Sequence, residues 1–289
     1  MSEATTAVRV ADDATPPAAW ALLAPAIAFL AVCLLAPLAA TAWLSLSPNV
    51  LVKFDGPGLD NYRYLFGKAY YFDTVLRTLR IAFNVTFVAL AVGYAAALAL
   101  KGVARRLGST LIVGLTFPIL AGPLIIVLGW MILLADGGPL IRPLVQAGWI
   151  GPLRLIGTET AIVIGLVHFT LPFVILTVYA SLSQIPDDLV EAARSLGAGP
   201  LQVFRRVVWP LSLPGVLSAA LIAFSLAASA YVSPHYLGGA AQLVLTTLVG
   251  QFILTTFNSQ MAGAAAMLLL VVMVILIFAF TRLMSRFIR

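Results

Sequence analysis

The polar side chains best placed for specific contacts lie in residues 187–197, between two long apolar stretches. This segment reads Asp-Asp-Leu-Val-Glu-Ala-Ala-Arg-Ser-Leu-Gly. Acids favour the positive end of a helix, and glycine favours a left-handed C-terminal conformation, so the pattern predicts a short helix. Leu189, Ala193 and Leu196 fall on one face of it, with Glu191 elsewhere around the helix. An apolar face with a charged rim has the chemistry of docking rather than of catalysis.

A second short helix is expected directly after this one. Pro200 is suited to the first turn of a helix, and Arg205 and Arg206 would lie near its negative end. Pro210 and Pro214 then break the helix or shape the entry to the next apolar stretch. Periodicity alone is explained equally well by an ordinary interfacial connector between two membrane spans.

The composition of the whole chain requires a membrane environment. Of 289 residues, 62% are hydrophobic and 10% are charged, far from the balance of a soluble domain. Only helices or closed barrels satisfy the backbone in lipid, and long apolar runs of about 20 residues indicate helices. We therefore expect an all-α polytopic membrane protein with six spans. They cover Trp20–Leu46, Thr74–Leu100, Ser109–Ala135, Thr160–Leu182, Leu211–Tyr231 and Ala262–Thr281.

These spans divide the chain into four parts. Residues 1–19 form a polar tail, 20–46 the first span, 47–73 an outer loop, and 74–289 a five-helix core containing the loop 184–210. A cleaved signal peptide is the alternative for the first span. The tail has no positive region, and the apolar run is too long for a signal peptide, so a retained helix is favoured. Cys33 lies in this run and is expected to be a buried apolar thiol.

Lys and Arg, which gather on the cytoplasmic side, indicate the orientation. With the N-terminus inside, ten of the 17 basic residues fall in cytoplasmic segments. The last outer segment, 232–261, has none, whereas the segments on either side of it carry three each. We therefore expect both termini and the 187–197 helix to face the cytoplasm.

The spans carry few ionisable groups. The third, fifth and sixth contain no Asp, Glu, Lys or Arg, which counts against a carrier or pump that passes ions through its own core. Arg77 and Arg80 are expected to reach lipid headgroups, and Glu159 to be a solvated loop charge. The uncharged polar residues form interhelical hydrogen bonds or line a translocation pathway. The residues concerned are Asn84, His168 and Gln251.

The spacing of the polar segment resembles a known family. Glu191-Ala192-Ala193, three residues, Gly197, nine residues, Val207, one residue and Trp209-Pro210 is similar to the EAA loop of type I ABC importer permeases. That family has Ile where this chain has Val207, and Leu where it has Trp209. The match extends to the position of the loop between the fourth and fifth spans.

This resemblance implies a function and a set of partners. The loop would be a coupling helix that docks in a groove of a cytoplasmic ATP-binding subunit dimer. The contact residues would be Asp188, Leu189, Glu191, Ala192, Ala193, Leu196 and Gly197, followed by Val207, Trp209 and Pro210 in the second half of the loop. The assembly would also contain a second permease, either a homologue or a second copy of this chain, and an extracytoplasmic solute-binding protein. It would lie in the bacterial inner membrane. The chain has no phosphate-binding loop of the Walker type, so ATP would be bound and hydrolysed by the partner.

A weaker resemblance concerns the solute. Tyr231 to Gly239, ending in Leu-Gly-Gly, is similar to a region of spermidine/putrescine-type permeases, which favours a polyamine. Relatives of that group also carry iron, thiamine, opines or phosphonates, and Leu-Gly-Gly is also an ordinary turn.

Three other classes of function are compatible with a polytopic membrane chain. The alternatives are a self-sufficient carrier or channel, an intramembrane enzyme and a structural assembly factor. An enzyme or metal site requires convergent acids, histidines or cysteines, and His168, His235 and Cys33 do not provide such a group. We expect no cofactor on the chain itself and no nucleic-acid partner.

Overall fold

The computed structural model describes residues 17–48, 58–148 and 154–287, and every regular element among them is a helix. Most of the predicted N-terminal tail lies outside these residues. Six helical stretches are long and apolar enough to cross a membrane, which confirms the all-α polytopic fold and the number of spans. They are Leu23–Leu46, Ala69–Gly102, Val113–Leu134, Glu159–Ser183, Pro200–Ser229 and Ser259–Arg282.

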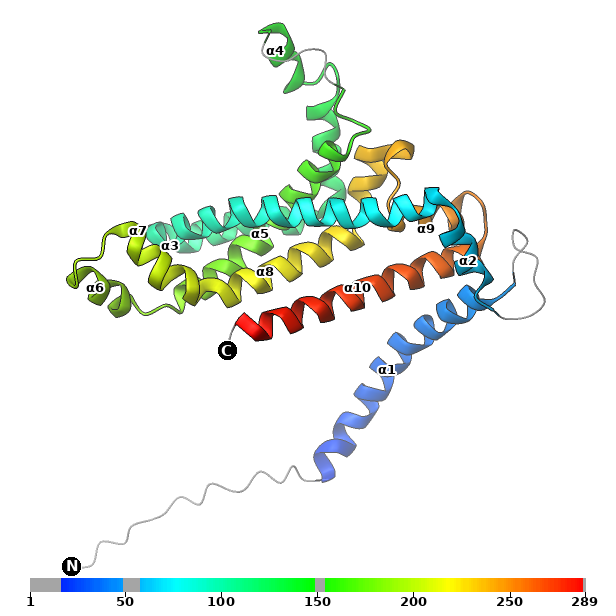
Figure 1. The fold of residues 1–289 in the computed structure, drawn as a ribbon, viewed down its shortest axis with the longest axis horizontal. Coiled ribbons are helices and arrows are strands. Elements are labelled where there is room, and N and C mark those ends of the chain that lie inside the picture. Colours follow the sequence, from blue (N-terminus) through cyan, green and yellow to red (C-terminus); the bar gives the residue numbers. More distant parts are fainter. Residues whose placement is uncertain (1–16, 49–57, 149–153, 288–289) are drawn as a thin grey trace, which may run out of the picture.

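Three helices form the centre of the bundle: α3 (Ala69–Leu134), α5 (Glu159–Ser183) and α8 (Trp209–Ser229). In Figure 1 they lie side by side with α10 (Ser259–Phe287). Glycines allow two of the close approaches. A Cβ on Gly93 of α3 would lie 2.6 Å from a Val174 methyl group of α5, and one on Gly215 of α8 would lie 2.2 Å from Ser181 Cβ. Side chains of α5 therefore pack directly on the backbones of α3 and α8 at these two glycines.

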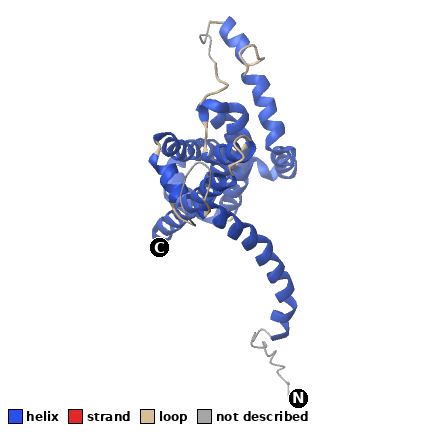
Figure 2. Cartoon of the chain, turned by 90° about the vertical axis from the view of Figure 1, so that its right-hand side faces the viewer, coloured by secondary structure: helices blue, strands red, loops and turns tan. Residues whose placement is uncertain are grey.

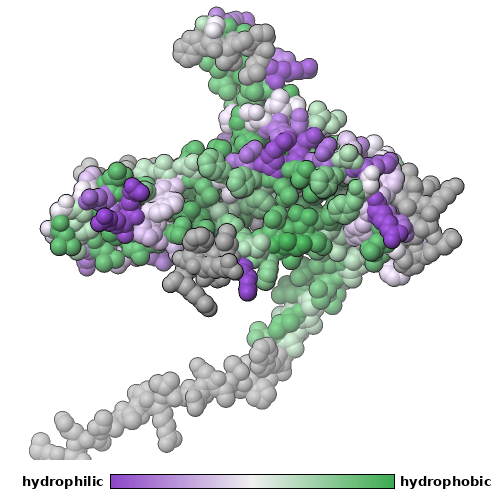
Figure 3. All heavy atoms as spheres, viewed as in Figure 1, coloured by the Kyte–Doolittle hydropathy of each residue, from purple (hydrophilic) through white to green (hydrophobic). Residues whose placement is uncertain are grey.

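The two ends of the bundle carry different short helices. At one end lie α6 (Asp187–Ser195) and α7 (Pro200–Val203); at the other lie α2 (Asp60–Gly67) and α9 (Leu245–Leu254) (Figure 1). The short helix α4 (Ile141–Gln146) projects away from the bundle. Hydrophobic atoms form a broad band between the two ends, and hydrophilic patches cover α6 and the α2 end (Figure 3).

Helix α3 differs from the sequence expectation of two separate spans. It is assigned as one element of 66 residues, and residues 101–108, which we had expected between the second and third spans, are helical. That stretch has no proline, and five of its eight residues are Lys, Arg, Ala or Leu, which favour a helix despite its two glycines. The non-helical residue is Gly122 instead, with φ +75°, followed by Pro123. Glycine tolerates this φ, and proline has no N–H to donate.

A second difference concerns residues 232–261, which the sequence analysis treats as an outer loop. They contain a π-helical turn (η2, Pro234–Gly238), a 3-10 turn (η3, Gly239–Gln242) and α9. The two halves of this α9 hairpin (residues 234–254) meet at an angle of 83°. Leu245, Leu248 and Phe252 of α9 are buried against α10. Because α9 has 10 residues, it is too short to register as a span in hydropathy.

Helix α1 (Pro17–Leu46) packs mainly against α10 and leaves the bundle at a wide angle (Figure 2). Nearly all its described side chains are exposed, and Ser45 near its end is buried against α2. Cys33 is exposed on this helix, so the expectation of a buried thiol is wrong for the isolated chain. The reason is that α1 has an apolar sequence but few helices around it.

Candidate functional site

The segment singled out by the sequence folds as predicted into two short helices with a glycine between them. Helix α6 begins after Pro186, with two acids in its first turn and Arg194 in its last. It ends in a Schellman motif: the Ala198 N–H donates to Ala193 O (3.1 Å) and the Gly197 N–H to Arg194 O (2.9 Å). Gly197 has φ +83°, which is why glycine is required there.

No residue of α6 is buried. Leu189 is 47% exposed and Leu196 is 89% exposed, at the hydrophilic end of the bundle that carries α6 (Figure 3). Glu191 and Ala192 are also exposed, and Ala193 is half-buried. The helix therefore presents its apolar positions outward, with acids at one end and a rigid cap at the other.

The second half of the segment joins α8 without a gap. Helix α7 begins at Pro200, continues as a π-helical turn over Phe204–Val208 (η1), and runs into α8 at Trp209. The sequence analysis allowed a break at Pro210. Proline removes one backbone donor and clashes with the carbonyl four residues earlier, and the wider π turn accommodates this. The Trp209 N–H accordingly donates to Phe204 O.

Aromatic side chains anchor this second half to α3. The ring of Tyr94 lies edge-on to Trp209 at 5.3 Å and to Phe204 at 6.1 Å between centroids. The Tyr94 hydroxyl is 2.9 Å from Ser212 Oγ, whose own proton goes to Trp209 O at 3.0 Å. Trp209, noted above as the departure from the family pattern, therefore has a structural role. Val207 is half-buried and Pro210 is exposed.

The first half is anchored to α3 by a lysine. Lys101 Nζ donates to the carbonyl oxygens of Leu182 (2.9 Å) in the last turn of α5 and of Ile185 (3.4 Å) just after it. It also lies 3.7 Å from Asp187 Oδ1 at the start of α6. A cation at a helix C-terminus satisfies carbonyls that lack an intrahelical partner. Neither Lys101 nor Tyr94 was identified as a site residue from the sequence, because Tyr94 is a single polar residue in an apolar run and Lys101 is one of three basic residues in 101–106.

The pathway residues proposed from the sequence lie on three different helices. Gln251 lines a cavity of about 490 Å³ beside α9. His168 of α5 accepts a hydrogen bond at Nδ1 from Trp130 Nε1 (3.0 Å), and Asn84 is exposed on α3. Of the three, all within the described part of the chain, Gln251 alone lines this cavity.

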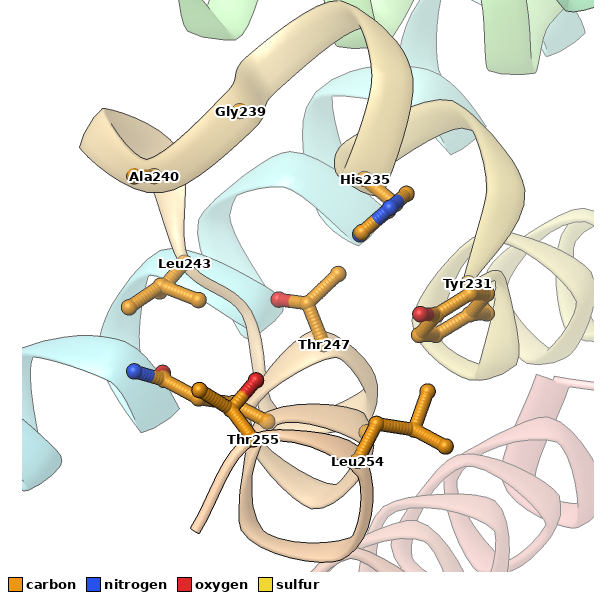
Figure 4. Close-up of a pocket in the computed structure, with 10 residues that line it drawn as sticks. Tyr231, His235, Gly239, Ala240, Leu243, Thr247, Leu254 and Thr255 are labelled. Atoms are coloured by element: carbon orange, nitrogen blue, oxygen red, sulfur yellow. The ribbon is translucent and has the colours of Figure 1, made fainter.

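Figure 4 shows the α9 cavity. The rings of Tyr231 and His235 stack at 5.1 Å between centroids with an angle of 15°. Thr247 and Gln251 of α9 and Thr255 directly after it line the cavity with neutral polar residues. A Cβ on Gly250 would lie 2.7 Å from the Tyr231 ring, so this glycine allows the ring to approach α9. The cavity has aromatic faces and hydrogen-bonding groups suited to a small polar solute.

Charged residues pair near this cavity instead of remaining solvated. Glu159 forms ion pairs with Arg80 and with Arg77, whose Nε lies 3.5 Å from the carboxylate. Arg77 also donates to Leu243 O (3.3 Å) at the entry to α9. The expectation that Glu159 is a solvated loop charge is therefore wrong, because it is paired and lies in the first turn of α5. The reach of the arginines to headgroups stays a prediction. The pairing was not predicted because Glu159 begins α5 and the arginines lie far away in the sequence, on α3.

Comparison with known proteins gives the class. Residues 89–289 match the family described as binding-protein-dependent transport system inner membrane component. The chain is 31% identical over 225 residues to the spermidine/putrescine transport system permease protein PotB of Haemophilus influenzae, covering 78% of each chain. It is 33% identical over 192 residues to PotB of Escherichia coli, covering 66% of this chain and 70% of the relative.

Solved structures share the fold. A bacterial ABC transporter involved in the import of the acidic polysaccharide alginate matches with a TM-score of 0.76 at 16% identity, covering 93% of this chain and 95% of the other. The MetNI methionine ABC transporter in an inward-facing conformation matches with a TM-score of 0.61 at 24% identity, covering 75% and 96%.

These matches make the chain a member of the binding-protein-dependent inner membrane component family. It is a permease subunit of an ABC importer, not an enzyme, and among its relatives are the spermidine/putrescine permeases. This membership confirms the permease interpretation made from the EAA-type spacing. It also favours that interpretation over a self-sufficient carrier or channel.

Proposed function

We propose that α6 is the coupling helix of this permease and docks in a groove of a cytoplasmic ATP-binding subunit. The observation that carries the proposal is the outward-facing apolar surface of α6, with Leu196 89% exposed beside a fixed glycine cap. Leu189, Ala193 and Leu196 would enter the groove or contact the base of the permease. Glu191 would make the orienting charged contact at the rim.

The orientation and the partners follow from this docking. The α6–α7 segment (residues 184–210) and both chain termini would face the cytoplasm, as the distribution of Lys and Arg predicts. A dimer of ATP-binding subunits would need two permease chains, either two copies of this one or this chain and a homologue. A soluble binding protein would deliver the solute on the opposite side, at the end of the bundle that carries α9.

The proposed mechanism uses no chemistry on this chain. ATP binding closes the partner dimer, and the two coupling helices move with it as rigid bodies. The spans then alternate between inward-open and outward-open states, because the nucleotide-bound partner favours one of them. The close packing of α3, α5 and α8 at Gly93 and Gly215 supports movement of these helices together.

The solute is proposed to be a polyamine or a similar small molecule, supported by the relatives named above and by the Leu237-Gly238-Gly239 segment. Gln251 would contact it in the α9 cavity, where the Tyr231 ring offers a face to a cation. His168 and Asn84 remain proposed pathway residues on α5 and α3. Uptake of labelled spermidine by the complete transporter, compared with liposomes containing this chain alone, tests the solute and the dependence on ATP.

Charge reversal on α6 tests the docking. We expect Glu191→Lys to reduce copurification with the ATP-binding subunit by about tenfold or more, since about 1.4 kcal/mol corresponds to a factor of ten. Gly197→Asp is expected to act in the same direction, because any side chain at φ +83° strains the backbone. Membrane insertion of both variants should be normal, because both positions are exposed.

The matched control is Asp136→Lys, the same kind of charge reversal at an exposed acid that lies near the α9 end of the bundle. It should leave copurification with the ATP-binding subunit unchanged. Normal copurification and normal ATP-driven uptake in both α6 variants would overturn the docking proposal.

A further inference from the structure

We propose that Lys101 and Tyr94 form a clamp on α3 that holds both ends of the α6–α7 segment, and that through it the movement of α6 reaches the spans. This inference rests on the proposed docking of α6 and adds the residues that transmit its movement. Both are positioning residues, since neither is placed to contact the solute or ATP. The clamp consists of these two polar side chains, which lie on one face of α3 and are called the anchors below.

The two anchors are seven residues apart, about two helical turns, so they lie on the same face of α3. Between them, Ala97 is fully buried and Leu100 is 6% exposed, in the same apolar cluster as Leu182 and Ile185. The face that carries the anchors is therefore fixed against α5. Neither side chain can move relative to its contact residues without disturbing the packing of Ala97 and Leu100.

Lys101 holds the first end of the segment. An ammonium group has three donors, and three oxygens face it: two carbonyls at the end of α5 and one carboxylate at the start of α6. Its side chain is 30% exposed, so these contacts are partly shielded from water. One side chain thus joins α3, the end of α5 and the first turn of α6.

Tyr94 holds the second end. Its hydroxyl meets Ser212, its ring packs against Trp209 and Phe204, and all three partners lie where the segment enters α8. Helix α6 itself has no buried residue that could transmit its movement to the bundle. Besides its contacts with α7 and η1, its attachments are short backbone links, one through Ile185 and Pro186 and the other through Gly197 and Gly199. The side-chain anchors are therefore what make the segment and α3 a single moving body.

Distances between spin labels test the clamp. The labels are placed at two exposed positions, Ala95→Cys on α3 and Ser195→Cys on α6, in a Cys33→Ser background. The complex with its ATP-binding subunits, in lipid nanodiscs, is measured without nucleotide and after trapping with ATP and vanadate. With Lys101 intact, we expect the same narrow distance distribution in both conditions, because α3 and α6 move together.

Lys101→Met keeps the length of the side chain and removes its charge and its donors. In this variant, the population with α6 attached to α3 should fall about tenfold relative to the detached population. The reason is that hydrogen bonds made by a charged group are lost. The label distance should then change when nucleotide is trapped. Lys101→Arg, which retains donors and charge, should restore the wild-type result.

A purely structural role for Lys101 would broaden the distribution equally with and without nucleotide, and this outcome would overturn the proposal. An unchanged distribution in Lys101→Met would also overturn it. Tyr94→Phe provides a milder second variant, because it removes one hydroxyl and keeps the ring contacts. It should produce a smaller nucleotide-dependent change, and no change would contradict the second half of the clamp.

Failure of the docking proposal would be recognised separately. In that case Glu191→Lys would copurify with the ATP-binding subunit as the wild type does. The clamp experiment measures one distance within this chain under two conditions, so reduced copurification of Glu191→Lys together with an unchanged distance in Lys101→Met contradicts the clamp alone.

Discussion

The α6–α7 segment and the α9 hairpin are built from similar parts but are stabilised in opposite ways. Each connects two spans through short helices, a π turn and a glycine with positive φ, Gly197 in one and Gly239 in the other. Helix α6 has no buried residue, whereas α9 buries Leu245, Leu248 and Phe252. Local capping defines the first segment, and tertiary packing defines the second.

This difference indicates how each segment can move. A helix held only at its ends can be displaced by a partner without opening the core. A helix that shares a core with α10 must move with α10 or lose buried contacts. The first arrangement suits a docking element that receives force, and the second suits a wall of a cavity whose shape has to be kept.

The largest difference in stability should come from replacing a leucine with alanine in the α9 hairpin and in the α6–α7 segment. Leu248→Ala removes a side chain that is 2% exposed and should cost about 2–5 kcal/mol in unfolding free energy. Leu196→Ala, at 89% exposure, should change stability by less than about 0.5 kcal/mol while weakening binding of the ATP-binding subunit. Thermal unfolding and copurification of both variants provide the measurement. Equal destabilisation would remove the contrast.

A buried hydroxyl makes the next largest contribution to the hairpin. Thr78 of α3 accepts a hydrogen bond from the first N–H of α9, at Leu245, over 2.9 Å. Thr78→Val keeps the shape and leaves that donor without its partner, which should cost about 1–3 kcal/mol. Thr116→Val on the same helix serves as the control, because its hydroxyl bonds to Val113 O within the helix. A control loss as large as the Thr78 loss would contradict this role.

The glycine cap of α6 should have an effect of about 1 kcal/mol. Gly197→Ala forces a side chain into φ +83° and should destabilise α6 by that amount. Gly199→Ala is the matched control, since its φ is −70° and a Cβ there meets open space. Amide hydrogen exchange of α6 should increase in the first variant and stay unchanged in the second. Equal exchange in both would show that the left-handed cap does not matter.

The smallest effect is expected at the exposed ion pair near the hairpin. Arg80→Gln removes a contact to Glu159 from a side chain that is 61% exposed, so unfolding should change by about 0–1 kcal/mol. Arg77→Gln should cost more, because Arg77 is half-buried and also donates to Leu243 O. The ratio of the two changes in melting temperature tests whether Arg77 contributes more to stability than Arg80. A larger loss for Arg80 would mean that Leu243 O is not an anchor for α9.

The sequence predicted the α6–α7 segment well because its signals are local. Acids, glycine and proline at fixed offsets act through backbone geometry, which needs no knowledge of the remaining chain. The α9 hairpin was missed because burial of Leu248 depends on α10, and its helix is shorter than a membrane span. Lys101 and the Arg77–Glu159 pair were missed for a related reason, since their partners lie on α5, about 80 residues away.

The central claim is that α6 meets an ATP-binding subunit on the cytoplasmic side, and Leu196→Cys in a Cys33→Ser background tests it directly. A membrane-impermeant maleimide should fail to label this cysteine from outside intact cells. It should label the cysteine in inside-out vesicles stripped of the ATP-binding subunit, and re-addition of that subunit should protect it. Labelling from the outside, or equal labelling with and without the subunit, would contradict the account.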